Sequence, residues 1–177
     1  MVINTSLGIT LAVVFYFIVP LCVLFLVRNK KALFIVASIL LLLFVVALIL
    51  LTLFDVSVSK DVVTIYAHFD KSWCSKTIHL SLLYGGIGDV ITNIIMLAPI
   101  GSYVVIYNYC FDKKYSIIKG LLIGLLVGFG IEAMQFILPV ARSVQLRDML
   151  LNGISAMLGA ILYVSILKLR NKILKIN

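Results

Sequence analysis

Long apolar stretches separated by short polar junctions dominate this chain of 177 residues. Five such segments can be identified, at about residues 7–27, 32–54, 90–110, 120–138 and 149–167. Each has roughly the 17–25 residues that a helix needs to cross a bilayer. A helix also satisfies its own backbone hydrogen bonds, which lipid cannot do. The pattern therefore predicts an all-α integral membrane protein with about five transmembrane helices.

Small residues are distributed unequally among these segments. The fourth segment carries Gly120, Gly124 and Gly128 at every fourth position, and the fifth carries Gly159. The first two segments consist mainly of Leu, Val, Ile and Phe. Helices in lipid associate through close packing at small residues, because no hydrophobic force drives them together. We therefore expect these four glycines to serve helix packing in a compact three-helix C-terminal core.

The same pattern suggests how the chain is organised. We expect an N-terminal transmembrane hairpin at 1–54, an extracellular loop at 55–84, the transmembrane core at 85–168 and a basic cytoplasmic tail at 169–177. The composition agrees, since 63% of the residues are hydrophobic and only 12% are charged. Soluble domains are about half apolar and a quarter charged. The N-terminus lacks the features of a cleaved signal peptide, so we expect the first apolar run to be retained.

The net charge of +8 gives topological information. Lys and Arg occur three, three and four times in the junctions 28–31, 112–119 and 168–177, ten in total, against five in the junctions 55–89 and 139–148. Short cytoplasmic loops carry the excess of Lys and Arg. We therefore predict a multi-pass protein of the cell membrane with its N-terminus outside and its C-terminus cytoplasmic. Because the basic residues are dispersed at segment ends, they do not indicate a nucleic-acid partner.

Polar residues gather where the last three segments approach the predicted outer surface. Ionisable groups beside such apolar helices mark a functional site by default. The predicted orientation places these residues at one depth, so we expect an outward-facing polar pocket that binds a ligand. Its candidate residues are Asp89, Asn93, Glu132, Gln135, Arg142, Asp148 and Asn152.

Some of these residues also have a structural interpretation. Asp89 and Asp148 lie near helix N-termini, where a carboxylate accepts hydrogen bonds from unpaired backbone N–H groups. Asn93 and Asn152 share the same four-residue spacing from these carboxylates and can bridge neighbouring helices. For these four residues the sequence leaves capping or helix bridging and ligand binding open.

Glu132 is harder to explain structurally. It lies about two turns before Pro139, close to the C-terminal end of its helix, where the helix dipole disfavours an anion. A charge at the centre of a spanning helix costs roughly 3 kcal/mol on insertion scales, and somewhat less at this shallower depth. Glu132 is therefore either protonated or paired with a cation. Arg142, in the following loop, is the nearest candidate, so we favour a functional role for both residues.

Together these residues resemble the VanZ family, named for an accessory protein of teicoplanin resistance in Gram-positive bacteria. The resemblance covers about residues 85–162 and implies a cell-envelope protein with reduced glycopeptide sensitivity as its trait. The stretch before it, His79-Leu-Ser-Leu-Leu-Tyr, departs from the Asn-Leu-x-Pro-Phe-like segment of many members. The motifs are D-x-x-x-N with P-x-G (Asp89, Asn93, Pro99, Gly101), I-E-x-x-Q with a downstream Arg (Ile131, Glu132, Gln135, Arg142) and R-D-x-x-x-N with a later Gly (Arg147, Asp148, Asn152, Gly159).

Two classes of function fit these residues. The first is a non-enzymatic protein whose pocket binds an anionic amphiphile, such as a lipid-linked cell-wall precursor, a teichoic-acid lipid or a lipoglycopeptide, through Arg and amide groups. The second is an enzyme that modifies such a lipid, with Glu132 or Asp89 as general base. A transporter is a weaker third possibility. The chain shows no Ser-His or Cys-His pair, metal-ligand set or phosphate-binding glycine loop, so we favour binding and expect neither metal nor cofactor.

Overall fold

The fold is known from a computed structural model that describes residues 19–53, 55–58, 63–66, 78–79, 87–137 and 144–174. Most of the predicted first segment therefore lies outside the described residues. So does the predicted extracellular loop, apart from three short strands. The last residues of the predicted basic tail, 175–177, lie outside them as well.

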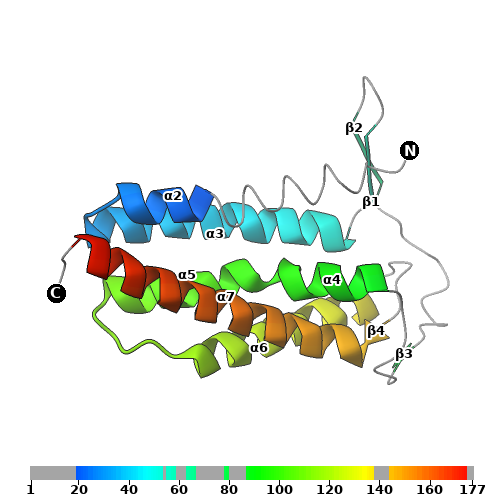
Figure 1. The fold of residues 1–177 in the computed structure, drawn as a ribbon. Helices are drawn as coiled ribbons and strands as arrows, with labels where there is room; N and C mark the ends of the chain where they lie inside the picture. Colours follow the sequence, from blue (N-terminus) through cyan, green and yellow to red (C-terminus); the bar gives the residue numbers. More distant parts are fainter. Residues whose placement is uncertain are drawn as a thin grey trace.

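Helices make up most of the described chain and run side by side along one axis (Figure 1). Two short strand pairs lie at one end of the bundle. One is the antiparallel pair of β1 and β2, and the other is the parallel pair of β3 and β4. The helices are α2 (Val19–Leu26), α3 (Lys30–Leu53), α4 (Ile87–Met96), α5 (Ala98–Cys110), α6 (Ile117–Ile137) and α7 (Leu146–Leu174), and the strands are β1 (Asp55–Val58), β2 (Val63–Tyr66), β3 (Ile78–His79) and β4 (Val144–Gln145).

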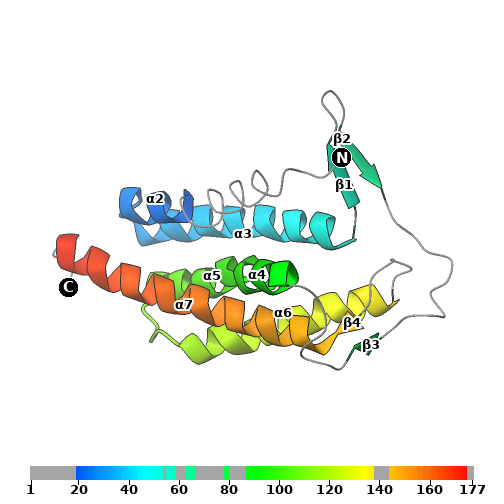
Figure 2. The same ribbon diagram turned by 45° about the vertical axis from the view of Figure 1, so that its right-hand side comes forward.

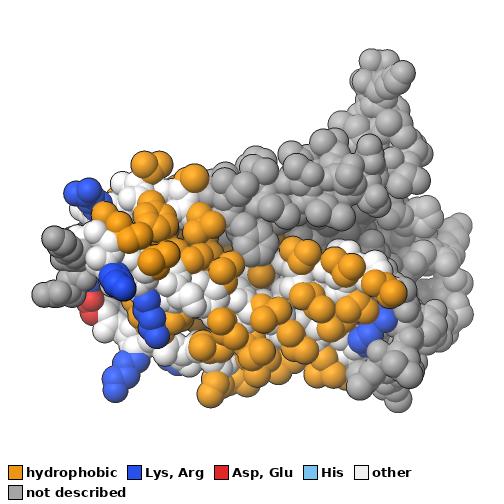
Figure 3. Space-filling view, viewed as in Figure 1, with side chains coloured by type: hydrophobic (Ala, Val, Ile, Leu, Met, Phe, Trp, Pro, Cys, Tyr) orange, Lys and Arg blue, Asp and Glu red, His pale blue; other side chains and the backbone are white. Residues whose placement is uncertain are grey.

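Four described helical stretches are long and apolar enough to cross a membrane, at 30–49, 90–110, 117–137 and 146–174. They correspond to the second to fifth predicted segments, which confirms the all-α membrane fold. Of the first predicted segment, α2 is the described part. Figure 3 shows hydrophobic side chains along the sides of the bundle, while Lys and Arg gather mainly at the end where the C-terminus lies. This surface is typical of a protein embedded in lipid.

The predicted three-helix core is confirmed. Helix α7 has its most extensive contacts with α6 and α5, and α5 also packs against α6 (Figure 2). Helix α3 packs against the other side of α5, and α2 packs against α3. The interior between α3, α5 and α7 is filled by fully buried apolar side chains such as Leu33, Val105 and Leu167.

Three glycines of α6, Gly120, Gly124 and Gly128, face α7. A Cβ on Gly120 would lie 3.0 Å from the Cβ of Ala160, and one on Gly124 would lie 2.5 Å from the Cβ of Ala156. A Cβ on Gly128 would lie 2.9 Å from the Cβ of Asn152. The four-residue spacing keeps these glycines on one helical face, so α6 presents a smooth stripe against which α7 lies.

Helices α5 and α7 approach even more closely. A Cβ on Gly101 would lie 1.7 Å from the carbonyl oxygen of Ala156, and one on Gly159 would lie 2.0 Å from the carbonyl oxygen of Ala98. Each glycine therefore faces the backbone of the other helix. Side chains can move aside, but helical backbone cannot without separating the helices, so both positions require glycine.

The third predicted segment is interrupted, which its apolar pattern did not indicate. Helix α4 ends at Met96 and α5 begins at Ala98, with Leu97 in a turn between them. Pro99 at the start of α5 explains the break, because proline has no N–H and its ring clashes with the carbonyl four residues earlier. The N–H of Leu97 donates instead to the hydroxyl of Ser155 in α7, at 3.0 Å. A side chain of the core thus restores a backbone hydrogen bond, as lipid requires.

We predict that Gly159→Ala lowers the free energy of unfolding by about 1–3 kcal/mol or more, the usual range for overpacking. The matched control is Gly130→Ala in α6, where an added Cβ would meet nothing within 4 Å. Alanine is favoured over glycine in a helix by about 0.5–1 kcal/mol, so the control should be neutral or stabilising. Thermal unfolding of the purified variants in detergent measures both. Equal effects of the two substitutions would contradict the close approach of α5 and α7.

Candidate functional site

The candidate site lies where α6 ends and α7 begins. On α6 the buried face consists of Gly120, Gly124, Gly128, Glu132 and Gln135. Glu132 is 7% exposed and Gln135 is 6% exposed. Their spacing continues that of the glycines, so the packing face changes from small residues to polar ones toward the end of the helix. Both side chains therefore lie within the protein rather than toward lipid.

Glu132 accepts a hydrogen bond from the backbone of the returning chain. The N–H of Gln145 donates to Glu132 Oε2 at 2.8 Å. Gln145 belongs to β4, where it pairs with His79 of β3, and it directly precedes α7. The carboxylate thus holds the start of α7 against α6. The sequence pointed to protonation or a cation, and it gave no sign of this backbone donor.

Arg147 and Asp148 form an ion pair in the first turn of α7. Arg147 Nε lies 3.3 Å from Asp148 Oδ1, and Arg147 Nη2 donates to Gln145 Oε1 at 3.2 Å. The side chain of Arg147 is only 7% exposed and that of Asp148 is 19% exposed. Asp148 also lies at the positive end of the α7 dipole, which stabilises a carboxylate. Sequence reasoning placed Arg147 in a loop, whereas the structure makes it a buried helical residue.

Asn152 lies one turn deeper, between α6 and α7, and is 1% exposed. Its side chain contacts the glycine stripe, because a Cβ on Gly128 would lie 3.3 Å from Asn152 Nδ2. Its Oδ1 is buried and has no hydrogen-bond donor among the described residues. An unpaired buried acceptor costs about 1–3 kcal/mol. Asn152 therefore has unused hydrogen-bonding capacity.

The other predicted site residues are only partly placed. Asn93 lies half-buried in α4, which packs against α7. Asp89 is in the first turns of α4, but its side chain lies outside the described part of the structure. Arg142 is also outside it, so its pairing with Glu132 stays a prediction. The structure thus places Glu132, Gln135, Asp148 and Asn152 at the α6–α7 end of the bundle, where Gln145 links Glu132 to Arg147 and Asp148.

This arrangement can bind hydroxyl, amide and anionic groups. It combines carboxylate and amide oxygens with a guanidinium whose five N–H groups suit a phosphate or carboxylate. In the described part of the chain no three His, Cys, Asp or Glu side chains come close enough to hold a metal ion.

Comparison with known proteins identifies the family. The VanZ/LLP1 family matches residues 13–168. This is most of the chain and extends well beyond the resemblance noted from the motifs alone, so the protein belongs to the VanZ/LLP1 family. No curated protein and no solved structure gives a match.

We predict that Glu132→Ala lowers the free energy of unfolding by about 1–3 kcal/mol, because the partly buried N–H of Gln145 loses its acceptor. Glu132→Gln should be milder, since its side-chain oxygen still accepts this bond. Met134→Ala is the control, because Met134 is on the same helix and 48% exposed. Thermal unfolding measures stability, and hydrogen exchange at the Gln145 amide reports the bond itself. Unchanged exchange in Glu132→Ala would rule out the bond.

Proposed function

We propose that this VanZ/LLP1 protein lowers the sensitivity of a Gram-positive bacterium to glycopeptide and lipoglycopeptide antibiotics of the teicoplanin type. It acts without catalysis, by binding an anionic amphiphile at the α6–α7 end of the bundle. The ligand is a membrane lipid, a lipid-linked cell-wall precursor or the lipoglycopeptide itself. Family membership supports the link to glycopeptide resistance, and the buried polar groups support binding.

The observation that carries the proposal is the buried Asn152 with its unpaired Oδ1. An acceptor at this position suits a hydroxyl or amide N–H of a headgroup. Arg147 lies five residues earlier on α7, and two of its N–H groups are used by Asp148 and Gln145. The remaining N–H groups can meet an anionic oxygen, and Arg142, which the sequence predicts to lie in the preceding loop, would add a second cation. A headgroup that carries both hydroxyl and phosphate matches this set.

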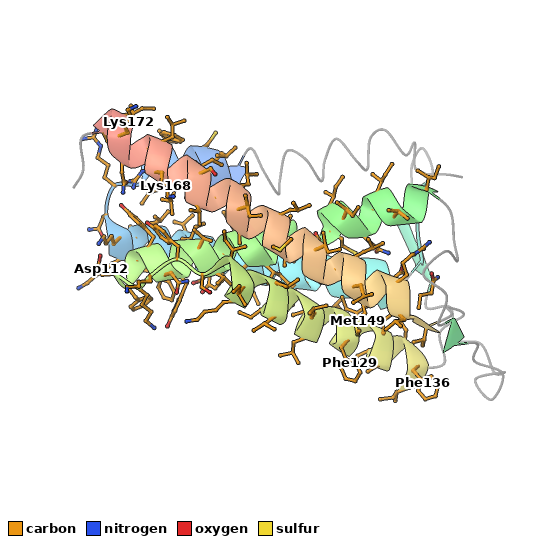
Figure 4. All side chains as sticks on the ribbon, turned by 60° about the horizontal axis from the view of Figure 1, so that its bottom comes forward. Asp112, Phe129, Phe136, Met149, Lys168 and Lys172 are labelled. Carbon is orange, nitrogen blue, oxygen red and sulfur yellow. The ribbon has the colours of Figure 1, made fainter. Side chains whose placement is uncertain are left out.

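The lipid-facing side of α6 suits the apolar part of such a ligand. Phe129 and Phe136 project from the outer side of this helix, near the site (Figure 4). They are 60% and 46% exposed, and Ile137 is 64% exposed. Acyl chains can therefore stay in the bilayer against these side chains while the headgroup reaches the polar end of the α6–α7 pair.

The orientation of the chain completes the proposal. The Lys and Arg bias supports a cytoplasmic C-terminus and an external N-terminus. The α6–α7 end with Glu132 then faces the outer leaflet, where lipid-linked precursors and glycopeptide antibiotics are found together.

The alternative is an enzyme that modifies a lipid-linked envelope precursor, with Glu132 or Asp89 as general base. One observation favours it, namely that a backbone N–H holds the buried Glu132 carboxylate in a defined position. A positioned carboxylate is what general-base catalysis requires. Lipid binding and the resistance phenotype, measured on the same variants, separate the two functions.

Cysteine labelling tests the orientation. In a Cys22→Ser background, an impermeant maleimide should label Cys74 in intact cells and leave Cys110 unlabelled until the membrane is permeabilised. Cys110 ends α5 at the basic end of the bundle and is partly exposed, whereas Cys74 lies in the predicted outer loop, outside the described residues. Labelling of Cys110 alone in intact cells would reverse the topology.

Arg142→Ala should weaken binding of an anionic lipid about tenfold or more, since a hydrogen bond to a charged group contributes about 1.5–3 kcal/mol. Lys71→Ala removes a charge from the outer loop but not from the site, and should have little effect. Native mass spectrometry of the purified protein with phosphatidylglycerol measures both.

The same lipids in the same proportions on wild type and Arg142→Ala would refute the headgroup role. Glu132→Gln then distinguishes the two classes of function. Joint loss of lipid binding and resistance supports binding, whereas loss of resistance with unchanged lipid binding supports catalysis.

A further inference from the structure

A second polar feature lies at the opposite end of the bundle, far from Glu132. A hollow of about 650 Å³ opens there between α3, α5, the α5–α6 loop, α6 and α7. This volume is within the range of about 300–1,000 Å³ typical of small-ligand sites. Four lysines line it, with Asp112 as the acidic residue among the lining side chains: Lys30, Lys113, Lys114 and Lys168. Figure 4 shows Asp112 and Lys168 at this end, with Phe136 and Met149 at the other.

Two of the four lysines are already engaged. Lys30 forms a salt bridge with Asp112. Lys113 Nζ donates to the hydroxyl of Tyr107 at 3.1 Å and lies 4.7 Å from the centre of that ring. Lys114 and Lys168 have no ion-pair or hydrogen-bond partner among the described residues. The hollow therefore carries two cations that are free to meet an anion.

Arg170 adds a buried positive charge behind one wall of the hollow. It is fully buried and donates to the hydroxyl of Tyr109 at 2.7 Å and to the carbonyl of Val27 at 3.3 Å. Tyr109 lines the hollow. Both acceptors are neutral, and no carboxylate within the described residues pairs with Arg170. Since such a charge is poorly screened by water, it raises the electrostatic potential of the hollow.

Neutral polar side chains complete the lining, among them Asn171, whose buried Oδ1 has no donor among the described residues. Asn108 is 2% exposed and lines the hollow, and its Nδ2 has no acceptor among the described residues. Partial burial raises the pKa of Tyr115, another lining residue, so its hydroxyl remains protonated at neutral pH. An unpaired buried amide donor beside two free lysines is a combination that suits a group with several anionic oxygens.

We propose that this hollow binds the phosphate of an anionic phospholipid headgroup from the leaflet on the basic side of the membrane, which the Lys and Arg bias predicts to be cytoplasmic. Basic pockets between transmembrane helices on that side are suited to such headgroups. The hollow lies at the level of the helix ends, and Ile117 and Val164 contribute apolar walls. Ile118, next to it on α6, is 68% exposed, so acyl chains can continue along the outside of the bundle. This inference is independent of the function proposed for the Glu132 end.

The test compares two double variants of the full chain with the same change in charge. Lys114→Gln/Lys168→Gln removes the free cations of the hollow. Lys119→Gln/Lys172→Gln removes two exposed lysines at the same end that do not line it. Binding of phosphatidylglycerol, with phosphatidylcholine as the neutral reference, is titrated by native mass spectrometry. At about 1 kcal/mol per lysine, the first variant should bind phosphatidylglycerol roughly 10- to 30-fold more weakly, and the second should change little.

Excess inorganic phosphate distinguishes the possible sources of the anion. Lysine-dependent phosphatidylglycerol binding that resists inorganic phosphate supports a lipid headgroup. Full displacement by inorganic phosphate overturns the lipid assignment in favour of a soluble phosphate. Equal losses of phosphatidylglycerol affinity in the two double variants would mean that only the general surface charge matters, and would overturn the site.

Asn108→Asp keeps the side-chain shape and adds a negative charge, so it should also weaken phosphatidylglycerol binding. Unchanged binding would show that Asn108 is not part of the site.

Discussion

The close approach of α7 to both α5 and α6 is the constraint on which the rest of this structure depends. In lipid no hydrophobic force holds helices together, so association relies on packing at small residues and on interhelical hydrogen bonds. Gly101 and Gly159 each face the backbone of the other helix, and the α6 stripe offers α7 a second smooth surface. Because α7 lies this close, Ser155 reaches the free N–H of Leu97, and Asn152 is enclosed against Gly128. Both ends of the protein are assembled around the same helix.

The parts of the fold that depend on periodicity could be predicted from the sequence. Gly120, Gly124 and Gly128 are spaced four residues apart and therefore share one face of the helix. Glu132 continues this spacing, so it lies on the same packed face and is buried. Partners that come from the backbone could not be predicted. The N–H of Gln145 carries no residue-type signal, and its place depends on how the chain returns after α6. The break at Leu97 was hidden because apolar residues continue through it, although Pro99 was a visible cause. In the sequence Arg170 counted only as one of the basic residues that indicate topology, and its acceptors, the Tyr109 hydroxyl and the Val27 carbonyl, lie far away along the chain.

The two ends of the bundle differ in how their charged side chains are paired. At the α6–α7 end each described charged side chain is restrained by its neighbours, since Glu132 holds a backbone amide and Arg147 holds Asp148. At the basic end the cations outnumber their partners, and Arg170 is buried against neutral acceptors. Removing one member of a restrained pair leaves an uncompensated group and mainly affects stability. Removing an unpaired surface lysine has little effect on the fold. Mutational effects at the first end therefore mix folding with function, whereas those at the second end report binding more directly.

The hydrogen bond from Arg170 to the carbonyl of Val27 has a consequence for how the protein is made. The two residues are 143 positions apart, and at about 5–20 residues per second synthesis takes roughly 7–30 s to pass from one to the other. During that interval α2 and α3 are inserted before the helix that completes their packing exists. The Val27 carbonyl, at the end of α2, must meanwhile be satisfied by water or lipid headgroups at the membrane surface. The contact between Arg170 on α7 and the end of α2 can therefore form only after the intervening described helices have been made.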